Sequence, residues 1–186
     1  MASSYRTGMS PVTFVAGATG QWRIDAVKAL SGESLGSGAR LEVREGIVTP
    51  IEAIWSLRAV SGHVRYVDRP EKTGLDPASP GLGRPEATRG ALIPIRKSDA
   101  WWALPQDERR AIFEARSRHI AGSMAYLPRI ARRLYHAREL GEPFDFLTWF
   151  EFAPEHEAAF DELLAFLRSR EEWLFVEREV ELRLSR

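Results

Sequence analysis

The 186-residue sequence contains no cysteine, and this absence removes several kinds of chemistry at once. Disulfides, zinc–thiolate centres, iron–sulfur clusters and cysteine nucleophiles all need thiols. An excess of either charge is also missing, because 26 Lys and Arg residues balance 26 Asp and Glu residues. Domains that bind nucleic acid usually carry a basic excess, so we expect no nucleic-acid partner.

Long hydrophobic runs are absent as well. No stretch approaches the roughly 20 apolar residues that a membrane helix needs. The polar segment 1–10 lacks the apolar centre of a signal peptide. We therefore expect no membrane partner and a cytoplasmic location, or a periplasmic one if a signal peptide has been removed upstream.

A Pro- and Gly-rich connection, 68–90, divides the chain into two halves. It contains four prolines and four glycines. Long connections inside compact proteins are often functional or join domains. We place the boundary here, with an N-terminal half at 1–90 that includes the connection and a C-terminal half at 91–186.

The C-terminal half has the clearer pattern. Four segments have the alternation or the aromatic content of strands: 91–97, 130–137, 145–152 and a last strand around 180–184. The segment 130–137 would also pass as a helix. A helix is expected over 105–119, because proline and acidic residues open it and Ile112, Ala115 and His119 share a face. A second is expected over 155–170, where apolar residues recur at i, i+3, i+4 and i+7. With 130–137 taken as a strand, the order is β-α-β-β-α-β, which is ferredoxin-like.

The N-terminal half looks like a shortened version of the same plan. Strands are expected at 12–18, 40–48, 53–60 and 63–67. A helix is expected at 21–30, because Trp22, Ala26, Ala29 and Leu30 have helical spacing. The predicted fold class is α+β: two ferredoxin-like halves, the first one shortened, forming an antiparallel sheet with helices packed on one side.

Histidine provides the first candidate for a reactive site. No H-x-x-x-H or H-E-x-x-H pair occurs, so a multi-histidine zinc site has no local support. His119 lies on the inward face at the end of its expected helix. It is either a helix-terminal histidine that interacts with the dipole or a metal ligand, and a single axial histidine is what haem requires. The second ring nitrogen of such a ligand usually donates to a carboxylate, for which Glu171 and Glu172 are the candidates.

An arginine provides the second candidate. In a strand over 130–137, Arg132 shares the inward face with Ile130 and Leu134. A buried guanidinium needs an anionic partner, which is either an internal carboxylate or a captured substrate anion. Thr148 and Phe150, one strand along, would line the same cavity.

Taken in order, these residues resemble the chlorite dismutase family, within a wider group that includes dye-decolourising peroxidases. The matching positions are 97–102, His119, Tyr126, 132–136, 144–152 and 170–173, with thirteen positions from His119 to Arg132. The similarity continues through 66–69 and 71–72 back to the first strand. The chain length and the shortened first half look like the short-chain subgroup, whose members are dimers.

The resemblance implies haem b in the C-terminal half, with His119 as the proximal iron ligand. Glu172 matches the carboxylate that hydrogen-bonds this ligand, with a register uncertain by one because of Glu171. Arg132 matches the distal arginine. The remaining matches are distal-pocket residues and residues near the haem edge and propionates: Thr148, Phe150 and Leu127 in the first group, and Tyr66, Lys97 and Trp101 in the second.

The reaction implied by the resemblance converts chlorite to chloride and dioxygen in a homodimer. Arg132 would attract the anion and retain a hypochlorite-level fragment until the O–O bond forms. Detoxification of chlorite and respiration of perchlorate use the same chemistry, and the sequence does not distinguish them. Three alternatives stay open: a coprohaem decarboxylase, whose relatives generally lack the distal arginine; a general haem peroxidase; and a non-catalytic ferredoxin-like dimeric binding module.

Overall fold

The structure, a computed structural model, describes the backbone of residues 11–61, 80–116 and 119–186, and the side chains of these ranges apart from 114–120. Eight antiparallel strands close into a barrel in the order β1-β3-β2-β8-β5-β7-β6-β4. The strands are β1 Pro11–Gly17, β2 Trp22–Ser31, β3 Arg40–Glu45, β4 Trp55–Val60, β5 Arg89–Lys97, β6 Ile130–His136, β7 Phe146–Phe152 and β8 Val176–Ser185.

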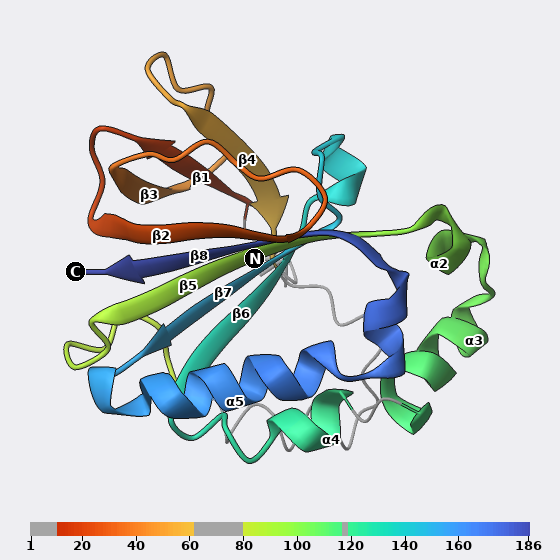
Figure 1. Ribbon diagram of the computed structural model, residues 1–186. Helices are drawn as coiled ribbons and strands as arrows, with labels where there is room; N and C mark the ends of the chain where they lie inside the picture. Colours follow the sequence, from red (N-terminus) through yellow and green to blue (C-terminus); the bar gives the residue numbers. More distant parts are fainter. Residues whose placement is uncertain (1–10, 62–79, 117–118) are drawn as a thin grey trace, which may run out of the picture.

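The helices that the structure describes all follow β5. They are α2 Asp99–Ala103, α3 Gln106–Arg110, α4 His119–Ser123 and α5 Glu157–Arg168. A π-helical turn, Ala111–Arg116, continues α3, and 3-10 turns lie at Arg138–Leu140, Pro154–His156 and Glu171–Phe175, the last of which we call η4. Figure 1 shows α5 lying along the outside of the barrel below β6 and β7, with α4 beside it. None of the helices in the described residues is long and apolar enough to span a membrane.

The closed barrel corrects the fold class expected from the sequence. An open α+β sheet of two ferredoxin-like halves with helices on one side is wrong, because strands from both ends of the chain pair with each other. Ile24 of β2 pairs with Leu184 of β8, and Val60 of β4 pairs with His136 of β6. In the described residues these two junctions close the sheet on itself, the second of them through a single residue pair. Local patterns indicate which segments become strands, but they carry no information on which distant strands pair.

The helix expected at 21–30 is also wrong, since this segment forms β2. Pairing with β8 shifts register between Ile24 and Ala26 and again between Ala29 and Ser31. Each bulge inserts an extra residue and moves later side chains to the other face. The strand therefore loses its regular period of two, and its apolar residues take on an apparent helical spacing.

Several other expected elements are confirmed. The segments 91–97, 130–137 and 145–152 form β5, β6 and β7, and the ambiguous 130–137 is a strand. The helix expected over 105–119 differs in that α3 passes into the π-helical turn and His119 begins α4. The strand expected at 63–67 lies outside the described residues.

Alternation along β7 separates two apolar cores. Leu147 and Trp149 point into the barrel, where they join Phe14 and the other interior residues. Phe146, Phe150 and Phe152 point outward and pack under α5. The ring of Phe160 on α5 lies 5.0 Å from Phe150 and 4.6 Å from Phe152. The outer face of β6 and β7 is therefore the face that α5 covers.

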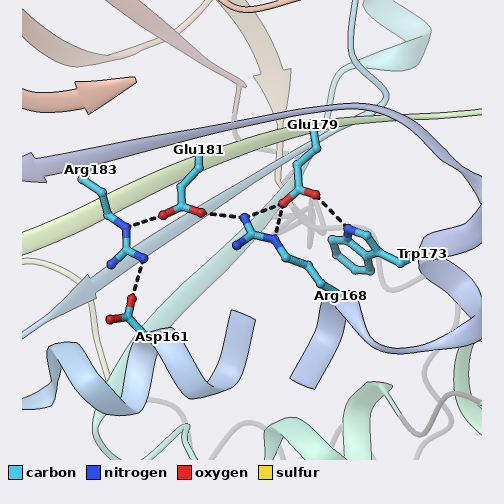
Figure 2. A network of polar contacts seen from close by, with 6 residues as sticks. All are labelled: Asp161, Arg168, Trp173, Glu179, Glu181 and Arg183. Atoms are coloured by element: carbon cyan, nitrogen blue, oxygen red, sulfur yellow. Dashed lines mark hydrogen bonds and ion pairs between the residues drawn. The ribbon is translucent and has the colours of Figure 1, made fainter. Parts of the chain in front are cut away.

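Ion pairs join α5 to the outward side chains of β8 (Figure 2). Arg168 near the end of α5 donates two hydrogen bonds to Glu179 Oε1, from Nε at 2.8 Å and from Nη2 at 2.6 Å. Its Nη2 also reaches Glu181 Oε2 at 2.6 Å. Arg183 donates from Nε to Glu181 Oε1 at 2.5 Å and from Nη2 to Asp161 Oδ1 at 2.6 Å. We call these five residues and Trp173, which also contacts Glu179, the α5–β8 network.

The α5–β8 network predicts a loss of stability in acid. Burial raises the pKa of Glu181, but hydrogen bonds from Arg168 and Arg183 outweigh burial and leave the pKa below its ordinary value of 4.5. The stabilisation is therefore present above pH 4.5 and is lost as the pH falls through the lower pKa of the folded state. We expect Glu181→Gln to flatten the dependence of the free energy of unfolding on pH in this range, measured by urea titration from pH 7 to pH 3. The matched variant Glu162→Gln, which removes an exposed carboxylate from α5, is expected to keep the wild-type slope.

Candidate active site

Arg132 lies on the face of β6 that α5 covers. It stands opposite Phe150 of β7, and Leu134 stands opposite Thr148. Phe150 is buried against α5, whereas Thr148 is partly exposed. The pairing of β6 with β7 thus places Arg132, Thr148 and Phe150 on one face of the sheet, while the cavity that they would line stays a prediction.

Arg132 is partly buried. Burial lowers its pKa, and the negative charge of Glu172 opposes this effect. Within the described part of the chain, no carboxylate forms an ion pair or hydrogen bond with this side chain. Desolvating a cation without pairing it is unfavourable, so the arrangement favours an anion from outside the protein.

Lys97 and Glu172 form a buried ion pair beside this region. Lys97 Nζ lies 2.6 Å from Glu172 Oε1, and the two side chains are 1% and 5% exposed. Lys97 ends β5, and Glu172 lies in η4. Burial lowers the pKa of the Lys97 ammonium, while the charge of Glu172 opposes that change. Glu172 therefore acts electrostatically on both Lys97 and Arg132.

Asp145 fixes the end of β5 on which Lys97 stands. Its Oδ2 accepts the Lys97 backbone N–H at 2.7 Å and the Trp102 indole N–H at 3.1 Å. Arg138 donates to the other oxygen at 3.2 Å. Sequence reasoning missed this residue, although a carboxylate between Phe144 and Phe146 in an aromatic segment was a usable signal.

The other predicted residues fall in different surroundings. His119 begins α4, and its side chain lies outside the described residues, as does all of Tyr66. Trp101 and Leu127 are buried, and Lys97 Nζ lies 4.5 Å from the centre of the Trp101 ring. The functional roles assigned to these residues by the resemblance, including a propionate contact for Lys97, stay predictions.

The residues of this region fit a haem with an anion site. Ile130 and Phe150 on the covered face are buried. Leu134, further along β6 on the same face, keeps 40% of its surface exposed. An apolar side chain with free surface, on the same strand face as a partly buried cation, matches the mixed apolar and charged surroundings of a haem. The expected ligand residues also fit a haem, which needs one histidine to bind the iron and one carboxylate to accept a hydrogen bond from the second ring nitrogen of that histidine.

Comparison with solved structures identifies the family. The chain is similar to the dimeric chlorite dismutase of Nitrobacter winogradskyi, with 55% sequence identity, a TM-score of 0.88, and coverage of 94% of this chain and 99% of that one. A chlorite dismutase from Candidatus Nitrospira defluvii shares 19% identity with a TM-score of 0.63, covering 95% of this chain and 91% of that one, which supports the fold alone. No protein-family model matches the sequence. At 55% identity over nearly the whole length, the chain belongs to the chlorite dismutase family.

Proposed function

We propose that this protein converts chlorite to chloride and dioxygen with a bound haem b, and that it works as a homodimer. The observation that carries the proposal is Arg132, a partly buried cation without a paired carboxylate in the described residues. It stands on the scaffold of a family whose member at 55% identity is a dimeric chlorite dismutase. A distal arginine also argues against a coprohaem decarboxylase, since by the resemblance those relatives generally lack it.

Arg132 would bind the chlorite anion and hold it throughout the reaction. A fixed positive charge in a site with little water needs little reorganisation as negative charge moves between oxygen and chlorine atoms. Phe150 and Thr148, paired with β6 beside Arg132, would restrict the space and keep the fragment close to the guanidinium. Retention matters because a hypochlorite-level fragment that escapes cannot form the O–O bond.

Haem would be held by His119, with Glu172 accepting a hydrogen bond from the second ring nitrogen. When bound, the haem supplies a ferric iron with one open coordination position for the anion. Lys97 would keep Glu172 ionised, since their ion pair is buried and 2.6 Å long. An ionised acceptor makes the imidazole a stronger donor to iron.

Oxygen release is the direct test of this function. Protein loaded with hemin should show an intense Soret band and release one dioxygen per chlorite at an oxygen electrode. The His119→Ala variant should lose most of the Soret intensity and the oxygen release, because the iron loses its protein ligand. Haem binding with decarboxylation of coprohaem and no oxygen release would instead indicate the decarboxylase, and a protein that does not bind hemin would indicate a binding module.

The homodimer is tested separately. Light scattering during gel filtration should give about twice the 21.0 kDa chain mass.

A further inference from the structure

The turn η4 carries Glu172 and is anchored to β8 by Trp173, the residue after Glu172. Trp173 donates its indole N–H to Glu179 Oε2 at 2.8 Å. Glu179 belongs to β8 and is buried, and its other oxygen takes the two hydrogen bonds from Arg168 (Figure 2). A continuous path therefore runs from Arg168 on α5 through Glu179 to Trp173.

The same tryptophan faces the buried ion pair. Lys97 Nζ lies 5.6 Å from the centre of the Trp173 ring and 4.5 Å from that of Trp101. Lys97 also binds Glu172, from Nζ to Oε1 at 2.6 Å. Trp173 thus has its polar edge fixed by Glu179 and its ring beside the cation that holds Glu172.

The backbone of η4 needs such an anchor. It is a 3-10 turn of five residues, Glu171–Phe175. Such turns have poorer hydrogen-bond geometry than α-helices and hold their side chains less firmly. The cap residue Arg170 makes no side-chain hydrogen bond to the turn. A backbone hydrogen bond from Ser98 N–H to the Phe175 carbonyl at 2.7 Å ties the end of η4 to the chain after β5, and side chains that reach the turn from outside add to this hold near Glu172.

Arg168 is suited to this task because two of its nitrogens donate to Glu179 and most of its side chain is buried. Its planar guanidinium sets the orientation of the Glu179 carboxylate through two donors to one oxygen. Burial lowers the pKa of Arg168, but hydrogen bonds from its donors to Glu179 and Glu181 outweigh burial and raise it overall. The cation is thus permanently charged, and Glu179 is left with Oε2 directed to the indole.

We propose that Arg168 is a positioning residue that acts through Glu179 and Trp173 to fix the Glu172 carboxylate against Lys97. This inference rests on the proposed function, in which Glu172 accepts a hydrogen bond from the iron ligand. Loss of Arg168 frees Glu179 to turn, weakens the hold on Trp173 and lets η4 shift. The acceptor then moves away from its optimal place, and the imidazole becomes a weaker donor to iron.

The test uses two readouts on Arg168→Gln. The first is the indole N–H signal of Trp173 in ¹⁵N spectra, assigned with Trp173→Phe and recorded without haem. The second is the iron–histidine stretching frequency of the ferrous haem protein, measured by resonance Raman. We expect the indole signal to shift and the stretching frequency to fall, with the reduction potential rising in parallel. Arg168→Lys, which keeps the charge, should fall between wild type and Arg168→Gln.

Asp161→Asn is the matched control, because it breaks the exposed Arg183–Asp161 end of the same network and leaves Glu179 intact. It should change neither readout. Trp173→Phe removes only the donor and keeps a ring beside Lys97, so it should lower the stretching frequency as Arg168→Gln does. The double variant Arg168→Gln with Trp173→Phe should lower the stretching frequency no further than either single variant, because both residues lie on one path.

Two results would overturn the positioning role. One is an indole signal that moves in Arg168→Gln while the iron–histidine frequency stays at the wild-type value in Arg168→Gln and in Trp173→Phe. The other is an indole signal that does not move at all. A wild-type protein that fails to bind hemin would instead contradict the proposed function, and the haem-free indole measurement would still decide whether Arg168 holds Trp173.

Discussion

Arg132→Ala is expected to lower kcat/KM for chlorite by roughly 10- to 150-fold, because a hydrogen bond to a charged group contributes about 1.5–3 kcal/mol and each 1.36 kcal/mol is tenfold in rate. The variant should keep its haem, since the predicted iron ligand, His119, lies on α4 and Arg132 on β6. The number of turnovers before inactivation should fall as well, because nothing would then retain the oxidising fragment. Oxygen-electrode traces at several chlorite concentrations give both quantities.

Arg133→Ala is the matched control for this prediction. Arg133 is the next residue of β6, is exposed, and points to the opposite face of the strand. Its loss removes the same charge from nearly the same place in the chain. We expect turnover and lifetime close to wild type, whereas equal losses in both variants would show that general surface charge matters and not the position of Arg132.

Salt dependence separates attraction from retention. If Arg132 acts mainly by drawing chlorite to the site, the wild-type rate should fall with ionic strength and the Arg132→Ala rate should not. If it acts mainly by holding the fragment, the two proteins should share the same salt dependence and differ in lifetime. The partly buried position of Arg132 favours retention as the larger effect, because salt screens buried charges weakly.

The sequence predicted the strands of the second half well because their signals are local. β7 carries aromatic residues on one face, and α5 has an apolar stripe that matches it. The prediction for β2 was wrong because two bulges remove the alternation on which strand prediction depends. Closure of the barrel was not predicted for another reason: it depends on pairs such as Ile24 with Leu184, which lie at opposite ends of the chain.

The residues of the candidate site also divide into those that local patterns place and those whose partners are distant in the chain. Arg132, Thr148 and Phe150 could be placed together because they alternate on two strands that follow one another in the chain and pair as neighbours. The partnership of Lys97 with Glu172 could not be predicted from pattern, because it joins the end of β5 to a 3-10 turn much later in the chain. Asp145 and the chain of contacts from Arg168 to Trp173 are hidden for the same reason, since ordinary charged residues acquire their roles only through distant partners.

Lys97→Met is expected to give the largest loss of stability, about 3–5 kcal/mol, because it removes the ammonium that is paired with the buried Glu172 carboxylate. The pair is almost fully enclosed, at 1% and 5% exposure, so water cannot replace the lost ammonium. For a chain of this size the melting temperature of the haem-free protein should fall by roughly 6–20 °C. Differential scanning calorimetry of the haem-free protein measures this without any effect of cofactor binding.

The double variant Lys97→Met with Glu172→Gln decides whether the loss comes from the buried Glu172 charge that Lys97 balances. A neutral amide tolerates burial better than a carboxylate, so the double variant should be more stable than Lys97→Met alone. Losses that simply add would contradict a direct ion pair. Lys97→Met with a wild-type melting temperature would contradict it too, and would remove the reason for assigning Lys97 to keeping Glu172 ionised.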